Sequence, residues 1–497
     1  MPKNRHIIIL EKNAAAHKSI KKECRTMKNL RKIIAFISAV SMTAGLSACA
    51  GSSDSTPTET AETTTALTVA VNTETLAPEQ QEQVADIADS LTGELENKTV
   101  KWLSFYDPWH PTGAGNTKPV SVELFEKKYG GEIEYYASSW STIYTDLSTY
   151  VLGGEGIDFF PAPEAVPKCV MNNMTQSFDS YIDWSSPLWE GVKSYNDSFA
   201  INGSHYLIVC QPVEGYVVYY NRRTVEENGL EDPAELYANG EWTMSKFKDM
   251  LTEFVDNDNG KYGLDGWFNA APIYLAGGVP TISMKDGKVV SNLSDPNLER
   301  MMAFEYDLSK NGLILDKSLF GWQPQIQYMG EGKELFYISG LYEIESAPDI
   351  WTKTFGEQSD VFFVPIPRDE DADKYYYNAE FDCYNLCRGA QNPEGVARLM
   401  ECVIASYNDE NAQAISDKKH IDDYGWSQDM IDMRNEVRRL TRENPVRDLY
   451  GGLPDDISSM ISNAISEPLN GNEWYSVRES IADAVQKGVD SANSQLS

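Results

Sequence analysis

Aromatic and acidic side chains carry most of the chemistry that this sequence offers. The chain contains 11 Trp, 27 Tyr and 17 Phe residues, and 75 of its 497 residues are Asp or Glu. Aromatic rings stack on the apolar faces of a ligand, and carboxylates accept hydrogen bonds from its hydroxyl groups. A hydrophobic core accounts for most rings, so the informative ones lie outside apolar runs. Such rings beside carboxylates would suit a carbohydrate-binding site.

Other kinds of chemistry are not indicated by the sequence. It has no phosphate-binding loop and no G-x-G-x-x-G, H-E-x-x-H, G-x-S-x-G or C-x-x-C motif. The histidines beyond the first 48 residues, His110, His205 and His420, are far apart in sequence. We therefore expect no metal and no cofactor. Residues 256–260 (DNDNG) hint at a calcium loop, but Lys261 and Trp267 stand where that loop needs Gly and Glu, so we predict a polar turn.

The cysteines do not form a disulfide framework. Apart from Cys24 and Cys49, they are few, odd in number and widely spaced: Cys169, Cys210, Cys383, Cys387 and Cys402. The pair Cys383 and Cys387 has no second pair or nearby histidine to complete a zinc site. We expect buried thiols.

The amino-terminal region predicts a lipoprotein signal. A basic stretch after Met27 precedes an apolar run from Ile33 to Leu46, and the sequence Leu-Ser-Ala-Cys ends at Cys49. At roughly 14 residues the run is shorter than the ~20 that a spanning helix needs. We predict a signal peptide at 27–48, lipidation of Cys49, and a start-site artefact at 1–26. An ordinary secreted protein with a chance cysteine is the alternative.

Charge excludes nucleic acid as a partner. The first 48 residues hold ten of the 42 Lys and Arg residues and two of the 75 acidic ones, so the remainder has a net charge of −41. Binding to phosphates requires basic patches, which such a chain lacks in bulk.

The elements that must position the aromatic and acidic residues alternate between strand and helix. A Ser/Thr-rich tether with a short helix occupies 49–97. Expected strands at 100–105, 132–136 and 157–160 alternate with helices at 119–129 and 142–152. This order predicts an α/β fold with a mostly parallel sheet, whose ligands bind beyond the carboxyl ends of the strands. In the later half we expect a strand at 361–364 and helices at 243–255, 296–311, 393–405 and 480–492.

A set of motifs resembles one family. In chain order they are residues 201–206 (INGSHY), 215–221 (GYVVYYN), 222–230 (RRTVEENGL), 232–233 (DP), 241–243 (EWT), 329–333 (MGEGK), 340–342 (GLY), 364–367 (VPIP) and 391–396 (QNPEGV). Together with the lipoprotein signal, this set is similar to extracellular solute-binding proteins of ABC importers, family 1, the carbohydrate-binding group. The resemblance spans roughly residues 98–490. Arg222, Tyr342 and His205 depart from the usual Lys, Trp and Lys, so the identity of the substrate does not transfer.

The resemblance implies a two-lobed periplasmic-binding-protein-like (type II) fold with crossing hinge strands. Lobe 1 would comprise 98–218 and 380–430, and lobe 2 would comprise 219–379 and 431–497. Residues 219–221 and 376–382 would be the crossings. The ligand would lie between the lobes and contact the following residues: Trp109, Trp140, Trp267, Trp322, Tyr106, Tyr342, Glu164, Glu214, Glu343 and Asp382.

The function that the resemblance implies is capture of a mono- or oligosaccharide for an ABC importer, without catalysis. The protein would be a monomer on the extracytoplasmic face of the cell membrane, held by lipid on Cys49, with permease subunits as partners. Two alternatives remain open. The same fold could bind a non-sugar solute such as a peptide or polyamine, or the acid-rich and Trp-rich chain could be a surface glycoside hydrolase.

Overall fold

The computed structural model describes residues 78–110, 118–161, 163–267, 270–345, 348–356 and 360–496. By its internal contacts the chain divides into two units, 1–65 and 66–497, and the account below concerns the second. The predicted signal peptide, Cys49 and the expected tether up to residue 77 lie outside the described residues. The short helix expected in the rest of the tether is present as α2 (Pro78–Ser90), but it packs into an apolar core through Val84, Ile87 and the following Leu91, so the folded part begins earlier than expected.

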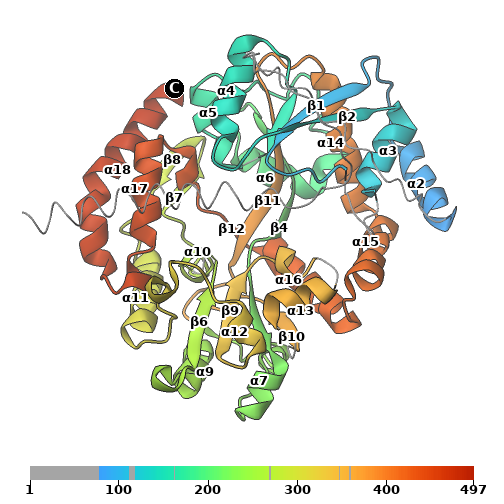
Figure 1. Ribbon diagram of the computed structural model, residues 1–497. Coiled ribbons are helices and arrows are strands. Elements are labelled where there is room, and N and C mark those ends of the chain that lie inside the picture. The colour runs from blue at the N-terminus through green and yellow to red at the C-terminus, as the bar shows by residue number, and fades with distance from the viewer. Residues whose placement is uncertain are drawn as a thin grey trace, which may run out of the picture. The chain divides into compact units, whose positions relative to one another are not determined.

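The first sheet combines parallel and antiparallel strands (Figure 1). Its order is β12 (Pro445–Val446), β11 (Tyr377–Leu386), β3 (Phe159–Pro161), β1 (Thr99–Ser104) and β2 (Glu132–Ala137), with β4 (Leu207–Glu214) also paired to β11. Strands β2 and β3 are both parallel to β1, whereas β11 is antiparallel to β3 and β4. This sheet and its helices are called lobe 1.

Local sequence explains how lobe 1 begins. Helix α3 (Val120–Tyr129) buries Leu124 and Phe125 and ends at Gly130, whose φ of 63° suits glycine. Helix α4 (Ile143–Gly153) buries Leu147 and ends at Gly154 in the same left-handed conformation. The strand and helix alternation expected over residues 100–160 is therefore confirmed, and it leaves the carboxyl ends of β1, β2 and β3 at one edge of the sheet.

The second sheet has the order β10 (Val361–Val364), β5 (Val217–Asn221), β9 (Glu334–Ser339) and β6 (Tyr262–Gly266). Strands β6 and β9 are parallel, so the residues that follow them emerge at one edge. Strand β5 is antiparallel to both of its neighbours. This sheet and its helices are called lobe 2, and a separate hairpin is formed by β7 (Ile282–Lys285) and β8 (Lys288–Ser291).

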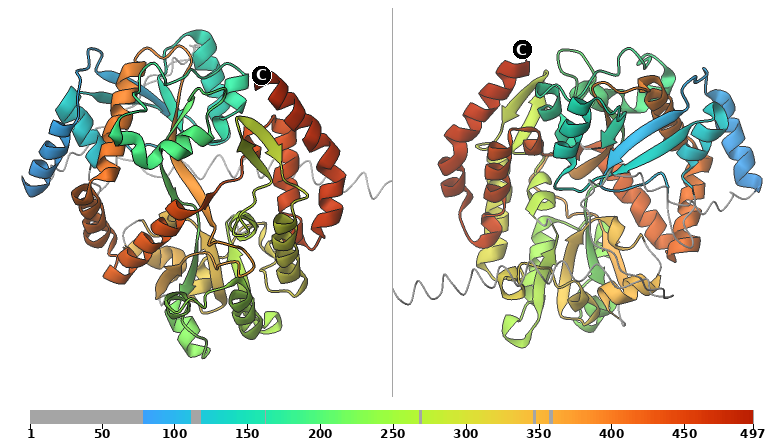
Figure 2. Two further views of the ribbon diagram at one scale, coloured as in Figure 1. Left: turned by 180° about the vertical axis from the view of Figure 1, so that it is seen from behind. Right: turned by 45° about the horizontal axis from the view of Figure 1, so that its top comes forward.

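Helices surround both sheets (Figures 1 and 2). In chain order, the others are α2 (Pro78–Ser90), α5 (Lys168–Met171), α6 (Lys193–Ser198), α7 (Arg222–Glu227), α8 (Pro233–Ala238), α9 (Met244–Phe254), α10 (Ala270–Leu275), α11 (Pro296–Lys310), α12 (Gln327–Gly330), α13 (Pro348–Phe355), α14 (Pro393–Asn408), α15 (Glu410–Tyr424), α16 (Gln428–Glu443), α17 (Asp455–Ile465) and α18 (Trp474–Leu496). Helices α17 and α18 lie side by side, next to the β7–β8 hairpin. The helices expected near 243–255, 296–311, 393–405 and 480–492 are all present.

The chain crosses from the first sheet to the second between β4 and β5, at Gly215 and Tyr216. Residues 219–221, expected as the crossing, lie inside β5, which pairs with β9 and β10. Strand β11 contains most of the other expected crossing, 376–382, and the Tyr377 hydroxyl donates to the carbonyl of Tyr216 at 2.7 Å. In Figure 1, β4 and β11 extend from the first sheet toward the second.

Both lobes have apolar cores, and the expected buried thiols are confirmed. The five thiols of Cys169, Cys210, Cys383, Cys387 and Cys402 are all buried. The expected polar turn is also present, because Asp256 caps a short 3-10 segment that ends at Gly260. Across the part of the chain that the structure describes, no helix is both long enough and apolar enough to cross a membrane.

Candidate functional site

The carboxyl ends of the lobe 1 strands present exposed aromatic rings. Tyr106 follows β1 and is 43% exposed, and Trp140 follows β2 and is 70% exposed. Phe105 lies between them, with its ring centroid 5.0 Å from each of theirs. The rings of Tyr106 and Trp140 thus form one aromatic surface at this edge of the sheet, as expected from their positions after strands.

Aromatic rings also follow the carboxyl ends of β6 and β9, the parallel strands of lobe 2. Trp267 follows β6, and Tyr342 and Glu343 follow β9 in the 3-10 segment η5 (Leu341–Glu343). The Ser339 hydroxyl lies 3.1 Å from the Tyr342 hydroxyl and donates to Glu343 Oε1 at 3.0 Å. Loss of hydration raises the pKa of Glu343, and the Ser339 hydrogen bond partly offsets this effect. An aromatic face and a hydrogen-bonded carboxylate are thereby held side by side.

Trp322 belongs to the same edge of lobe 2 through a loop. It follows the 3-10 segment η4 (Lys317–Phe320) and is 65% exposed. Asp265, near the end of β6, accepts a hydrogen bond from the Gln325 backbone at 2.6 Å and lies 3.5 Å from the ammonium group of Lys317. The loop that carries Trp322 is therefore tied at both ends to the strand that precedes Trp267.

The adjacent residues Arg447 and Asp448 join residues of both lobes, and no motif of the sequence pointed to them. Its guanidinium group forms ion pairs with Glu164, which follows β3, and with Glu380 on β11. The neighbouring Asp448 accepts hydrogen bonds from the Tyr274 hydroxyl and the Thr281 backbone. The expected ligand-binding residue Glu164 is thus already engaged by a cation, 283 residues away in sequence.

Tyr216, at the crossing between the lobes, lies within electrostatic reach of Arg447, Tyr342 and Glu164. Burial raises the pKa of Tyr216 to about 12, and the charge of Arg447 works in the opposite direction. Tyr342 and Glu164 also contribute to its pKa. The residue at the crossing between the lobes therefore lies within electrostatic reach of both strand-end groups, a placement that motif spacing did not predict.

Two polar residues that were expected to contact the ligand, Asp382 and Glu214, interact with other side chains of the protein. Asp382 accepts a hydrogen bond from the Tyr407 hydroxyl at 2.5 Å, and loss of hydration raises its pKa. Loss of hydration at the Tyr106 hydroxyl raises the pKa of that group although the ring is partly exposed, and the charge of Asp382 adds to this effect, so the two residues are near each other. Glu214 lies 3.5 Å from Arg438, and its Oε2 atom is buried with no hydrogen-bond partner.

Trp109 does not join the strand-end rings. It is only 4% exposed and packs against Trp102, Phe159 and Tyr384, with ring centroids 5.6 to 6.4 Å away. Its position after a strand and beside a proline suggested a ligand contact, but the chain turns back there and places the ring in the core. We therefore leave Trp109 out of the candidate site.

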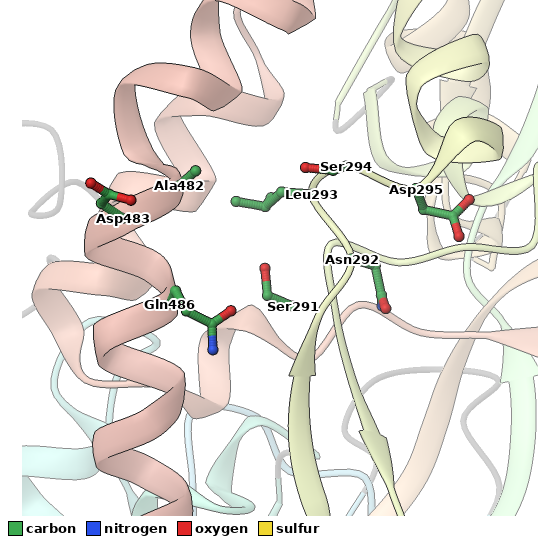
Figure 3. A pocket seen from close by; sticks show the side chains of 8 residues that line it. All are labelled: Ser291, Asn292, Leu293, Ser294, Asp295, Ala482, Asp483 and Gln486. Atoms are coloured by element: carbon green, nitrogen blue, oxygen red, sulfur yellow. The ribbon is translucent and has the colours of Figure 1, made fainter.

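A separate polar pocket of about 390 Å³ lies between α18 and the segment that connects β8 to α11 (Figure 3). Its lining residues are Ser291, Asn292, Leu293, Ser294, Asp295, Ala482, Asp483 and Gln486. In Figure 3, Asn292 and Asp295 point away from α18. This pocket contains no aromatic ring and none of the expected site residues. Within the described ranges, no group of three or more His, Cys, Asp or Glu side chains could hold a metal ion.

Comparison with solved structures identifies proteins of similar fold. The ABC substrate-binding protein of Listeria monocytogenes in complex with cycloalternan is 15% identical over 79% of this chain and 99% of that chain, with a TM-score of 0.57. An extracellular solute-binding protein of Staphylococcus aureus in complex with maltose is 13% identical over 80% and 98%, with a TM-score of 0.54. The galacto-N-biose-/lacto-N-biose I-binding protein of Bifidobacterium longum in complex with lacto-N-biose is 12% identical over 78% and 97%, also at 0.54.

The sequence itself gives a family match. A search of curated protein sequences found none that matches. Residues 121–418 match the model of the bacterial extracellular solute-binding proteins, a span of more than half of the chain that includes strand ends of both lobes. The two-lobed fold and this match agree with the resemblance carried by the motifs. The chain belongs to the family of bacterial extracellular solute-binding proteins.

Proposed function

We propose that this protein binds a carbohydrate between its two lobes, delivers it to the permease of an ABC importer, and does no chemistry on it. The family is extracellular, so the protein acts outside the cytoplasm. The similar structures named above hold cycloalternan, maltose and lacto-N-biose, which supports a sugar as the ligand here.

One observation carries the proposal. Among the residues that the structure describes, six aromatic side chains are exposed by 37% or more, and five of them are Tyr106, Trp140, Trp267, Trp322 and Tyr342. All five follow the strands of the two lobes or belong to a loop tied to such a strand. Aromatic faces stack on the C–H faces of sugar rings, and the ligands of an α/β sheet bind beyond the carboxyl ends of its strands, where these rings lie.

The carboxylates of the site fit an uncharged ligand better than a polyamine. Glu164 and Glu380 are both paired with Arg447, and Glu214 lies beside Arg438. A polyamine would require several convergent carboxylates without cations of their own. Glu343, whose one hydrogen bond comes from a serine hydroxyl, is suited to accept hydrogen bonds from sugar hydroxyl groups.

The same pairing argues against a glycoside hydrolase. Such an enzyme needs one carboxyl group that holds a proton and a second that is free to attack or to activate water. Two carboxylates of the site, Glu164 and Glu380, share the guanidinium group of Arg447. Both carboxylates are thus engaged in ion pairs, so neither is free to attack a sugar or to activate water.

Anchoring through Cys49 completes the proposal. A lipid on Cys49 and the Ser/Thr-rich tether would keep a monomeric binding protein near its permease. At least two acyl chains are needed for stable attachment, and the lipoprotein pathway supplies them.

Calorimetric titration of the purified protein against neutral mono- and oligosaccharides, spermidine and mixed peptides tests the proposal. We expect at least one glycan to bind with micromolar affinity or better and to be recovered unchanged. The variant Glu343→Gln should weaken this binding about tenfold, because charge-assisted hydrogen bonds are the stronger ones. Glu331→Gln, at an exposed site in the same lobe, should leave it unchanged. Binding of spermidine or peptides alone, or release of reducing sugar, would refute the proposal.

A further inference from the structure

The loop that carries Trp322 is built as a fixed platform. Lys317 donates a hydrogen bond to the carbonyl of Gly266 and lies 3.5 Å from Asp265, which is fully buried. Asp265 also accepts from the Gln325 backbone. A buried carboxylate is an expensive group to place in a fold, and this one holds both ends of a surface loop in place.

The loop holds an apolar side chain in water in a conformation that the side chain disfavours. Trp322 has a φ of 65°, in the left-handed region that residues with a side chain rarely adopt. Its backbone nitrogen donates to the carbonyl of Lys317 at 2.8 Å, which fixes this conformation. The adjacent Leu319 is 73% exposed. Neither backbone preference nor burial explains an indole here, so a ligand contact is the reason that fits.

The number of exposed rings bears on the size of the ligand. Trp267, Trp322 and Tyr342 lie at one edge of lobe 2, and Tyr106 and Trp140 lie at the corresponding edge of lobe 1. A sugar ring has two faces, so a monosaccharide contacts at most two aromatic rings by stacking, and a disaccharide contacts at most four. Five rings therefore match a ligand of at least three sugar rings.

We infer that the ligand is an oligosaccharide of three or more sugar rings and that Trp322 stacks on an outer ring, so that Trp322 sets the preference for chain length. This inference rests on the proposed carbohydrate function. It adds that monosaccharides and disaccharides bind more weakly, because they leave the outer platform empty.

A retention experiment with sized glycans tests this inference. Partial acid hydrolysates of starch, cellulose, xylan and chitin are incubated with the full protein, and the retained chains are sized by mass spectrometry. We expect retained chains of three or more rings. Trp322→Ala should reduce their retention about tenfold and should shift the retained population toward shorter chains.

Two further variants separate binding from folding. Trp322→Gly removes the indole and relieves the positive φ, so it should lose the long chains while its thermal unfolding midpoint does not fall below that of Trp322→Ala. Tyr475→Ala removes the sixth exposed ring, at the start of α18, and should retain chains as the wild type does. Retention of monosaccharides and disaccharides by the wild type, or equal retention by Trp322→Ala, would overturn the inference and leave the carbohydrate proposal intact. Retention of no glycan at all would overturn both.

Discussion

Arg447 pairs with two carboxylates of the site that are distant from each other in sequence. Its side chain is 15% exposed and lies between Glu164 of lobe 1 and Glu380 on β11. Without this cation, the two carboxylates would face each other in a poorly hydrated region. Their repulsion and the loss of two ion pairs should both destabilise the fold.

Replacing Arg447 should therefore reduce stability. We expect Arg447→Gln to lower the free energy of unfolding at pH 7 by about 2 kcal/mol, measured by urea denaturation. The control is Lys353→Gln, which removes an ion pair with Asp349 whose two side chains are 75% and 70% exposed. That variant should change the free energy by less than about 0.5 kcal/mol. Equal effects of the two variants would mean that the ion pairs of Arg447 stabilise the fold no more than an exposed pair does.

Single residues were the hardest feature to predict from the sequence. Trp109 and Trp140 both follow strands and both stand beside residues typical of turns, yet one is 4% and the other 70% exposed. The difference arises from Phe159 and Tyr384, which come from other strands and enclose Trp109. Arg447 escaped prediction for the same reason, because its partners are distant in sequence and no local pattern connects them.

At the scale of elements, β6 and β9 carry an unusual pair of buried carboxylates. Asp265 on β6 and Glu334 on β9 are both fully buried, and neither oxygen of Glu334 has a hydrogen-bond partner. Burial raises the pKa of Glu334 well above its ordinary value of 4.5, and the charge of Asp265 adds to this effect. Lys317 offsets only part of it.

The raised pKa of Glu334 predicts how stability depends on pH. Above pH 4.5, and up to the raised pKa, the folded state retains a proton that the unfolded state has released, so stability falls as the pH rises. Glu334→Gln removes this proton binding. The free energy of unfolding of Glu334→Gln, relative to that of the wild type, should therefore rise by on the order of 1 kcal/mol between pH 4 and pH 7. Thermal unfolding at a series of pH values measures it.

Glu331→Gln, at a side chain that is 44% exposed, is the matched control for the substitution itself. A constant difference between Glu334→Gln and the wild type from pH 4 to pH 7 would show that Glu334 is ionised in the folded protein, contrary to the account of this strand pair.

Elements were far more predictable than residues. The helices that end at Gly130 and Gly154 were expected because glycine there permits a left-handed conformation, and the helix after Thr243 because a threonine side chain caps it. The crossing between the sheets was expected at residues 219–221 and lies at Gly215 and Tyr216. An apolar run such as 217–221 fits the middle of a buried strand as well as a crossing, and only the pairing with β9 and β10 separates these cases.

At the scale of the whole molecule, the lobes are tied together beyond the crossing strands. Arg447 pairs with Glu164 and Glu380 of lobe 1, whereas the adjacent Asp448 accepts hydrogen bonds from Tyr274 and Thr281 of the α10 to β7 region, which follows β6 of lobe 2. Lys168 of α5 also pairs with Asp455 at the start of α17. Closure of the lobes around a ligand is a hinge motion, and these contacts are the ones that such a motion must keep or break.

Attachment of the molecule to the membrane is predicted to depend on Cys49 alone. Cys49→Ser should abolish lipidation while the folded unit, which begins beyond the tether, binds ligand as before. Cell fractionation followed by immunoblotting should find the variant in the soluble fraction and the wild type in the membrane fraction. If Cys49→Ser stays with the membrane, another segment provides the anchor.

A crystal structure of the protein with an oligosaccharide bound tests the central proposal most directly, because it shows where the sugar lies. We expect sugar rings between the two lobes, stacked on Tyr106 and Trp140 from lobe 1 and on Trp267 and Tyr342 from lobe 2, with Glu343 accepting hydrogen bonds from their hydroxyl groups. A sugar seated in the polar pocket between Ser291 and Gln486, or held by one lobe alone, would contradict the account.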